Sequence, residues 1–226
     1  MDVVLVGGLW LTASAWDEVV PALEDRGHRA VAVSLPGQGD GNAGATLQDQ
    51  VNAVLAMVDT LDRPWVVGHS AACSLAWVVA DARPDGIAGV TLVGGFPAAD
   101  GELYADFFEI VDGAMPFPGW DAFEGPDSAD LGGETRARMS NSAAPVPEGV
   151  ARAVVRLRDE RRHDVPVLVV CPEFSPKQAR KWIEGGDVPE LQRARQVNFA
   201  DLDSGHWPMF TRPDALAGCI VPDEEP

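Results

Sequence analysis

A serine flanked by small residues follows an apolar run in the first third of the chain. Residues 68–72 read Gly-His-Ser-Ala-Ala, directly after Trp-Val-Val and directly before a second apolar stretch. Small residues on both sides of Ser70 permit the sharp strand-to-helix turn that exposes a nucleophilic hydroxyl. The same letters also suit a helix N-terminus capped by Ser70, so this pattern alone leaves both interpretations open.

A histidine late in the chain could supply the base for such a serine. His206 lies in Asp-Ser-Gly-His-Trp-Pro, after the last strand-like run and before the final predicted helix. The carboxyl ends of parallel strands meet at one edge of a sheet, where Ser70 and His206 could converge. His28 and His163 lie beside charged residues at predicted helix ends, and we expect His69 to shape the pocket beside the serine. The sequence therefore favours Ser70 as nucleophile and His206 as base.

A glycine pair ends the first apolar run, at Val6-Gly7-Gly8-Leu9-Trp10. An oxyanion requires backbone N–H groups that point to one position, and a glycine-rich loop permits that close approach. The candidate donors are the amides of Leu9, Trp10 and Ala71. A plain strand-to-loop turn would explain the same glycines.

Short apolar, β-branched runs recur along the chain, and runs that are apolar throughout, without alternation, predict strands buried on both faces of a parallel sheet. They cover residues 2–6, 29–35, 65–68, 89–93, 165–171 and 196–202. Helical patterns lie between them, at 15–26, 46–61 and 71–83, and a last helix is predicted from about Pro213. In the first of these, Trp16, Val19, Val20 and Leu23 form one apolar stripe. This alternation predicts an open α/β sheet with right-handed crossovers.

The regular alternation stops between about residues 97 and 150, where Gly, Pro, Asp and aromatic residues crowd together. No strand is predicted there. The aromatic residues favour an ordered lid over a disordered insert. We expect one domain over residues 1–226 with this lid inserted in it, and we expect Trp120 and Trp207 to contact a substrate.

Composition limits the partners. The chain has 226 residues, 46% of them hydrophobic, and 35 acidic against 17 basic residues give a formal charge of −18. This charge disfavours nucleic acid and anionic membranes. No apolar run is long enough for a membrane span, and the acidic tail 221–226 is expected to fray.

The cysteines, which form no C-x-x-C pattern, indicate a reducing, cytoplasmic setting. No motif for a metal, nucleotide or other cofactor is present, and the oligomeric state stays open.

Together these motifs resemble the α/β-hydrolase superfamily, in its small esterase-like branch. Gly7 to Trp10 resemble its His-Gly oxyanion loop with glycine in place of histidine, and residues 35–39 resemble its L-P-G-x-G turn. Residues 68–72 are similar to its nucleophile elbow with Ala72 in place of glycine, and residues 204–206 to its histidine loop. Because residues 2–6 lead directly into the oxyanion loop, the family's first hairpin is expected to be absent, which leaves about six parallel strands.

The resemblance does not identify the acid. Family members carry Asp after the strand that here covers 165–171, but this chain reads Pro-Glu-Phe-Ser. Glu173 is the nearest carboxylate that could orient the imidazole. Asp100, after the preceding strand, is the alternative, and a dyad without an acid is a third. Asp203 is expected to serve the loop's own hydrogen bonding.

These residues predict a serine hydrolase that cleaves a small apolar carboxylic ester through an acyl-enzyme; thioesters and lactones stay open. A hydroxynitrile-lyase-like or C–C bond enzyme on the same fold is an alternative. A lyase of that kind would require an additional positively charged group near the serine. Lys177 and Lys181 are the only lysines, and both fall in a predicted helix after Glu173. A non-catalytic protein that binds a small ligand is the other rival.

Overall fold

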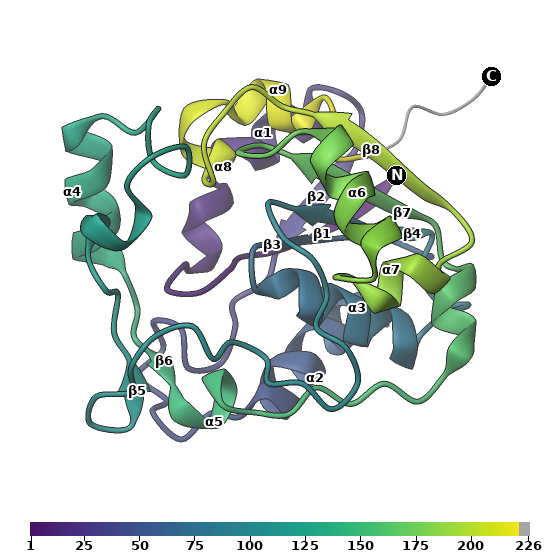
Figure 1. Ribbon diagram of the computed structural model, residues 1–226, viewed down its shortest axis with the longest axis horizontal. Helices are drawn as coiled ribbons and strands as arrows, with labels where there is room; N and C mark the ends of the chain where they lie inside the picture. The colour runs from purple at the N-terminus through teal and green to yellow at the C-terminus, as the bar shows by residue number, and fades with distance from the viewer. Residues whose placement is uncertain (222–226) are drawn as a thin grey trace.

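A computed structural model describes residues 1–221. Its main sheet has six strands, all parallel, in the order β2-β1-β3-β4-β7-β8 (Figure 1), which confirms the predicted fold class. The strands are β1 (Asp2–Val6), β2 (Arg29–Ala32), β3 (Trp65–His69), β4 (Gly89–Val93), β7 (Val167–Cys171) and β8 (Val197–Asp201). Apart from Val221, the tail that was expected to fray lies outside the described residues.

The strand register brings the predicted motifs to one edge of the sheet. Val6 pairs with Gly68, and His69 pairs with Val93. The loops that follow β1, β3 and β4 therefore leave the sheet at the same level. This edge is where the residues of interest meet.

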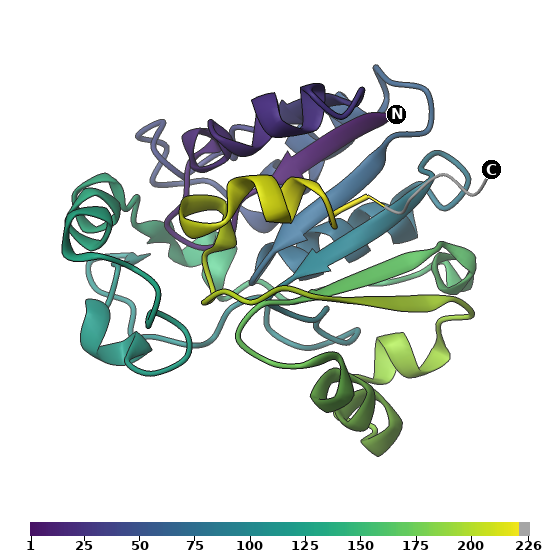
Figure 2. The same cartoon turned by 90° about the horizontal axis from the view of Figure 1, so that it is seen from above.

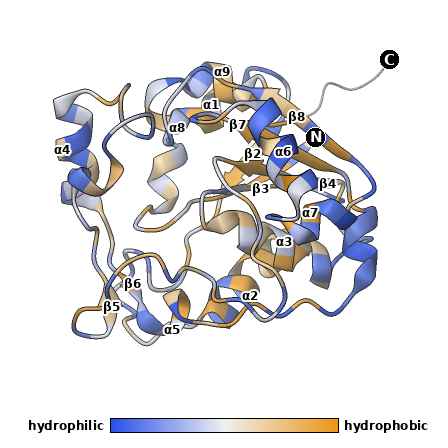
Figure 3. Ribbon diagram, viewed as in Figure 1, coloured by the Kyte–Doolittle hydropathy of each residue, from blue (hydrophilic) through white to orange (hydrophobic). Residues whose placement is uncertain are grey.

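Helices cover both faces of the sheet. They are α1 (Val19–Glu24), α2 (Leu47–Val58), α3 (Ala72–Ala82), α6 (Pro176–Gly185), α7 (Pro189–Arg193), α8 (Pro208–Thr211) and α9 (Pro213–Ala217). Val4 and Val6 of β1 pack in a core with α2, α3 and α6, whereas Val3 and Leu5 pack in a second core with α1, α8 and α9. Alternate side chains of β1 thus enter two apolar layers, which explains why this strand is apolar after Asp2. Figure 2 shows helices on both sides of the sheet, and Figure 3 colours much of the sheet as hydrophobic.

The first helix is shorter than the predicted 15–26. Residues Ala13–Trp16 form a 3₁₀ turn, and α1 begins only at Val19. Pro21 explains the break, because a proline ring clashes with the carbonyl four residues earlier and prevents a helix from extending back through Asp17. Trp16 is still fully buried, as the predicted apolar stripe requires.

The other predicted helices form close to their expected limits. Thr46 caps α2 in a capping box, since its hydroxyl accepts from the Asp49 amide and the Asp49 carboxylate accepts from the Thr46 amide. The last helix, α9, begins at Pro213 as predicted, and the additional short helix α8 precedes it. None of the helices among residues 1–221 is long and apolar enough to cross a membrane.

The segment between β4 and β7 was expected to hold no strand, and this is wrong. Two strands of two residues each, β5 (Ala114–Met115) and β6 (Val146–Pro147), form a small antiparallel ribbon. The helices here are α4 (Gly133–Ser142) and α5 (Glu148–Ala151), with 3₁₀ turns at Trp120–Phe123 and Glu160–Asp164. Two residues are too few to show a period of two in the sequence. Figure 2 shows α4 on the side toward which the arrowheads of β1 and β3 point.

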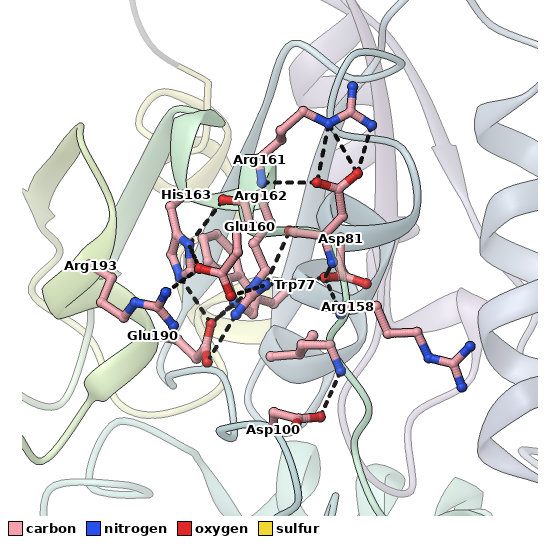
Figure 4. Close-up of polar contacts among 12 residues, drawn as sticks. Trp77, Asp81, Asp100, Arg158, Glu160, Arg161, Arg162, His163, Glu190 and Arg193 are labelled. Atoms are coloured by element: carbon pink, nitrogen blue, oxygen red, sulfur yellow. Dashed lines mark hydrogen bonds and ion pairs between the residues drawn. The ribbon is translucent and has the colours of Figure 1, made fainter.

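A buried ionic cluster ties the end of this segment to α3 (Figure 4). The Arg162 side chain is only 2% exposed, and its Nε donates to Glu190 Oε2 at 2.8 Å. The indole of Trp77, from α3, donates to the same oxygen at 3.0 Å. Burial raises the pKa of Glu190, but the hydrogen bonds from Arg162 and Trp77 outweigh burial and lower it below its ordinary value. The cluster thus anchors the chain beside the helix that follows Ser70.

Candidate active site

Ser70 occupies a strained turn between β3 and α3. Its φ is +55°, a region that non-glycine residues rarely adopt. A Cβ at Gly68 would lie 2.2 Å from the carbonyl oxygen of Ala72, so only glycine fits there. The helix-cap interpretation of Ser70 is wrong, because the N-cap of α3 is Ala71 and no side chain caps this helix.

Gly68→Ala is expected to lower the free energy of unfolding by about 3 kcal/mol or more, because the added methyl meets backbone that cannot move without opening the turn. Gly133→Ala is the matched control, since a Cβ at Gly133 would meet nothing within 4 Å. Urea unfolding of both variants measures the difference. Equal stability of the two variants would show that the turn is not constrained in this way.

The structure brings Ser70, His206 and Glu173 into one hydrogen-bonded chain. His206 Nδ1 lies 2.7 Å from Glu173 Oε1, and His206 Nε2 lies 2.9 Å from Ser70 Oγ. Because the Glu173 carboxylate accepts a hydrogen bond from Nδ1–H, Nε2 is left as the acceptor for the serine hydroxyl. Such a chain can withdraw the hydroxyl proton as the oxygen attacks a carbonyl carbon.

The other candidate acids lie elsewhere. Asp100 accepts from the backbone N–H of Leu157 at 2.9 Å, and Figure 4 places it near the buried ionic cluster. Asp203 is exposed to solvent. Within residues 1–221, Glu173 is the only acidic side chain bonded to the His206 ring.

His69 is buried behind the histidine loop. Its Nε2–H donates to the backbone carbonyl of His206 at 2.7 Å, and its Nδ1 has no hydrogen-bond partner among the described residues. Burial, and secondly the neighbouring His206, lower the pKa of His69 to about 3. The neutral ring therefore supports the backbone that carries His206.

This burial predicts a pH dependence of stability. In the unfolded chain His69 takes up a proton below about pH 6.5, whereas the folded protein resists protonation down to about pH 3. The unfolded state is thus favoured as the pH falls through this window. Between pH 7 and pH 5 the wild-type protein is expected to lose about 2 kcal/mol more unfolding free energy than His69→Gln, which keeps a donor. Urea unfolding at both pH values measures this, and equal losses would contradict it.

The loop after β1 lies against the serine. A Cβ at Gly8 would lie 2.9 Å from the His69 carbonyl oxygen and 3.0 Å from Ser70 Cβ, so only a residue without a side chain permits this approach. The amides of Leu9, Trp10 and Ala71 donate to no acceptor within the described part of the chain. These N–H groups are free to bind an oxygen beside Ser70.

Two acidic residues that the sequence analysis missed hold the histidine loop. The amide of His206 donates to the carbonyl of Asp127 at 2.7 Å, and the amide of Gly205 donates to Asp130 Oδ2 at 2.9 Å. Thr211 Oγ1 donates to the same Asp130 oxygen at 2.7 Å. Asp130 and Gly205 are 75 positions apart, and no local pattern could have paired them.

Two cavities meet at Ser70. The smaller, about 60 Å³, is lined with the serine by His206, Trp10, Phe107, Phe108, Phe123 and Trp207. The larger, about 310 Å³, is lined with the serine by Ser74, Gly95, Phe96, Leu103, Tyr104 and Phe107. His69 and Trp207 also belong to the lining of the smaller cavity. Trp120 packs behind Trp207, with ring centroids 5.4 Å apart, and lines neither cavity.

No lysine or arginine is among the described residues that line these two cavities. Lys177 and Lys181 lie exposed on α6. Cys73 is fully buried in α3, and burial raises the pKa of its thiol. The chemistry available at this point is therefore that of a neutral hydroxyl, an imidazole and a carboxylate.

Comparisons with known proteins identify the family of the chain. The sequence model of the α/β hydrolase family matches residues 3–218. A pyrethroid hydrolase of Sphingobium wenxiniae is 25% identical over 256 residues, which cover 97% of this chain and 86% of the relative. The fold is similar to that of an extracellular α/β-hydrolase from a Paenibacillus species, with a TM-score of 0.80 and 20% identity over 98% of each chain. It is also similar to an Arabidopsis methylesterase, with a TM-score of 0.74 and 17% identity over 96% of each chain. Because the family match spans nearly the whole sequence, the protein belongs to the α/β-hydrolase family.

Proposed function

We propose that the protein is a serine hydrolase that cleaves a small, neutral, apolar carboxylic ester through an acyl-enzyme. The observation that carries this proposal is the hydrogen-bonded chain from Glu173 through His206 to Ser70. The left-handed φ of Ser70 supports it, because strain of this kind is typical of a serine presented as a nucleophile.

In this mechanism Ser70 is the nucleophile, and His206 serves as base and then as acid. Ser70 Oγ attacks the ester carbonyl while His206 Nε2 takes its proton, and Glu173 stabilises the imidazolium that forms. The amides of Leu9, Ala71 and Trp10 donate to the oxyanion. His206 then returns the proton to the departing alcohol, and water, activated by the same imidazole, releases the acid.

The surroundings favour an uncharged substrate. Aromatic side chains dominate the smaller cavity, and the formal charge of −18 repels anions. The pyrethroid hydrolase and the methylesterase support ester hydrolysis as the reaction. We assign residues 97–150 as a lid over the site within a single domain. All three cysteines are free, which supports a cytoplasmic location.

A panel of neutral methyl esters with acyl chains of two to eight carbons tests this function. We expect steady release of methanol and the free acid from the wild-type protein, and none above background from Ser70→Ala. Glycerol esters of the same acids and charged succinate monoesters serve as comparisons, and the charged esters should be poor substrates. Absence of turnover with every ester, together with tight binding of the uncleaved compounds, would favour a ligand-binding protein instead.

A further inference from the structure

The two cavities at Ser70 differ in size and in the chemistry of their walls. The smaller, of about 60 Å³, contains the His206 side chain and Leu9 in its lining. The larger, of about 310 Å³, contains Ala71 but not His206. Ser70 and Phe107 are the two residues that line both. Phe107 therefore stands between them at the serine.

The mechanism decides which half of an ester enters each cavity. The departing oxygen must lie within hydrogen-bond reach of His206 Nε2, because this nitrogen returns the proton to it. The carbonyl oxygen points between the amides of Leu9, in the lining of the smaller cavity, and Ala71, in that of the larger. The alkoxy group then lies in the cavity that His206 lines, and the acyl group extends into the other.

The walls of the smaller cavity are held by contacts among aromatic rings. The Trp10 ring lies 5.5 Å from Phe108 and 5.9 Å from Phe123, and Phe123 lies 5.1 Å from Trp207, between centroids. The Trp10 indole N–H donates to the carbonyl of Met115 at 3.1 Å, which fixes its orientation. Enlarging this cavity would break several ring contacts at once. Its volume of about 60 Å³ suits a group of one to about three carbons, since a water molecule takes up about 30 Å³ of the liquid.

The larger cavity suits the acyl half of the ester, if that half is the bulkier one. Its volume of about 310 Å³ is at the lower end of the range for small-molecule pockets, about 300 Å³. Phe96, Leu103 and Tyr104 give it apolar walls, and the nearby Glu102 carboxylate disfavours a charged acid group.

We propose that the substrate is an ester of a one- to three-carbon alcohol with a bulkier, apolar acyl group, and that Phe107 sets this division. This inference rests on the proposed serine hydrolase. The Ser70 Oγ to carbonyl-carbon bond forms, the bond from that carbon to the alkoxy oxygen breaks, and the serine proton leaves on the small alcohol through His206. A water oxygen then bonds to the acyl carbon as the bond from that carbon to Ser70 Oγ breaks, one water proton returns to Oγ through His206, and the bulky acid leaves.

Two isomeric esters test the division directly. Methyl 3-phenylpropanoate carries its phenyl group on the acyl side, and 2-phenylethyl acetate carries the same group on the alcohol side. We expect kcat/KM to favour the methyl ester by at least about tenfold, after division by each rate of hydroxide hydrolysis, because the phenethyl group does not fit beside His206. Equal values, or a preference for the acetate, would overturn the inference.

Phe107 provides the second arm of the experiment. Its side chain is 63% exposed, so Phe107→Ala is expected to fold normally. Its removal joins the two cavities and should reduce the preference for the methyl ester at least about fivefold, mainly through faster cleavage of the acetate. Val111→Ala is the matched control, because Val111 is a 50% exposed residue of the same segment that lines neither cavity. An unchanged preference in Phe107→Ala, or an equal change in Val111→Ala, would contradict the role of Phe107.

The two levels of the proposal fail differently. If a fluorophosphonate labels Ser70 but neither isomer is hydrolysed, the assignment of the cavities is wrong and the serine mechanism stands. If the probe does not label Ser70, the proposed function itself is wrong.

Discussion

Replacement of Glu173 by Gln is expected to lower kcat for a methyl ester by about three to four orders of magnitude, with little change in KM. The neutral amide no longer stabilises the imidazolium, and it allows the tautomer in which Nε2 carries the proton and cannot accept from Ser70. Glu173 Oε2 is buried without a hydrogen-bond partner in the described part of the chain, so the loss of charge should not reduce folding stability. Steady-state kinetics and urea unfolding of the same preparation measure both quantities.

Asp100→Asn is the matched control for this prediction. Asp100 accepts from the Leu157 amide, and an Asn oxygen can accept the same bond, so kcat should stay within about twofold of wild type. If Glu173→Gln also stays near the wild-type value, the acid is not required and Ser70 and His206 act as a dyad. A large loss in Asp100→Asn alone would transfer the role to that residue.

Ser70→Ala and His206→Ala are each expected to lower kcat by about four to six orders of magnitude, and the double variant should be no slower than either single variant. The two side chains act as one unit through the 2.9 Å contact between Oγ and Nε2, so removal of either abolishes the attack. The residual rate reports the oxyanion donors and binding alone. The rate of background hydrolysis, measured with heat-treated protein, must be subtracted from each rate.

A loss of kcat in the double variant equal to the product of the two single losses would contradict this prediction. They would mean that serine and histidine act in separate steps. Retention of near-wild-type turnover in His206→Ala would assign the base to another group.

The four central strands were predictable because they are buried on both faces, which leaves an apolar run in the sequence, whereas the edge strands β2 and β8 are partly exposed. The ends of the helices were less predictable than the strands. Pro21 shortens α1, although Trp16 and Leu23 of its apolar stripe are buried as expected. The ribbon of β5 and β6 could not be predicted, since its strands are paired by residues far apart in the chain and each is two residues long.

Ser70 and His206 stand in local motifs, and their positions at strand ends predicted that they would converge. Glu173 was one of three open alternatives, because the sequence does not tell how far a side chain reaches from the end of a strand. Asp130 had no local signal, since its role depends on a fold that brings residues 97–150 back to the histidine loop. The division of the site by Phe107 depends on packing in three dimensions.

Intact-protein mass spectrometry after exposure to a fluorophosphonate tests the proposed nucleophile most directly. The wild-type protein is expected to gain one probe adduct per chain, with loss of ester turnover in proportion to labelling. Peptide mapping should place the adduct on Ser70, and Ser70→Ala should gain none. Absence of labelling in folded wild-type protein, or equal labelling of Ser70→Ala, would contradict the serine-hydrolase mechanism.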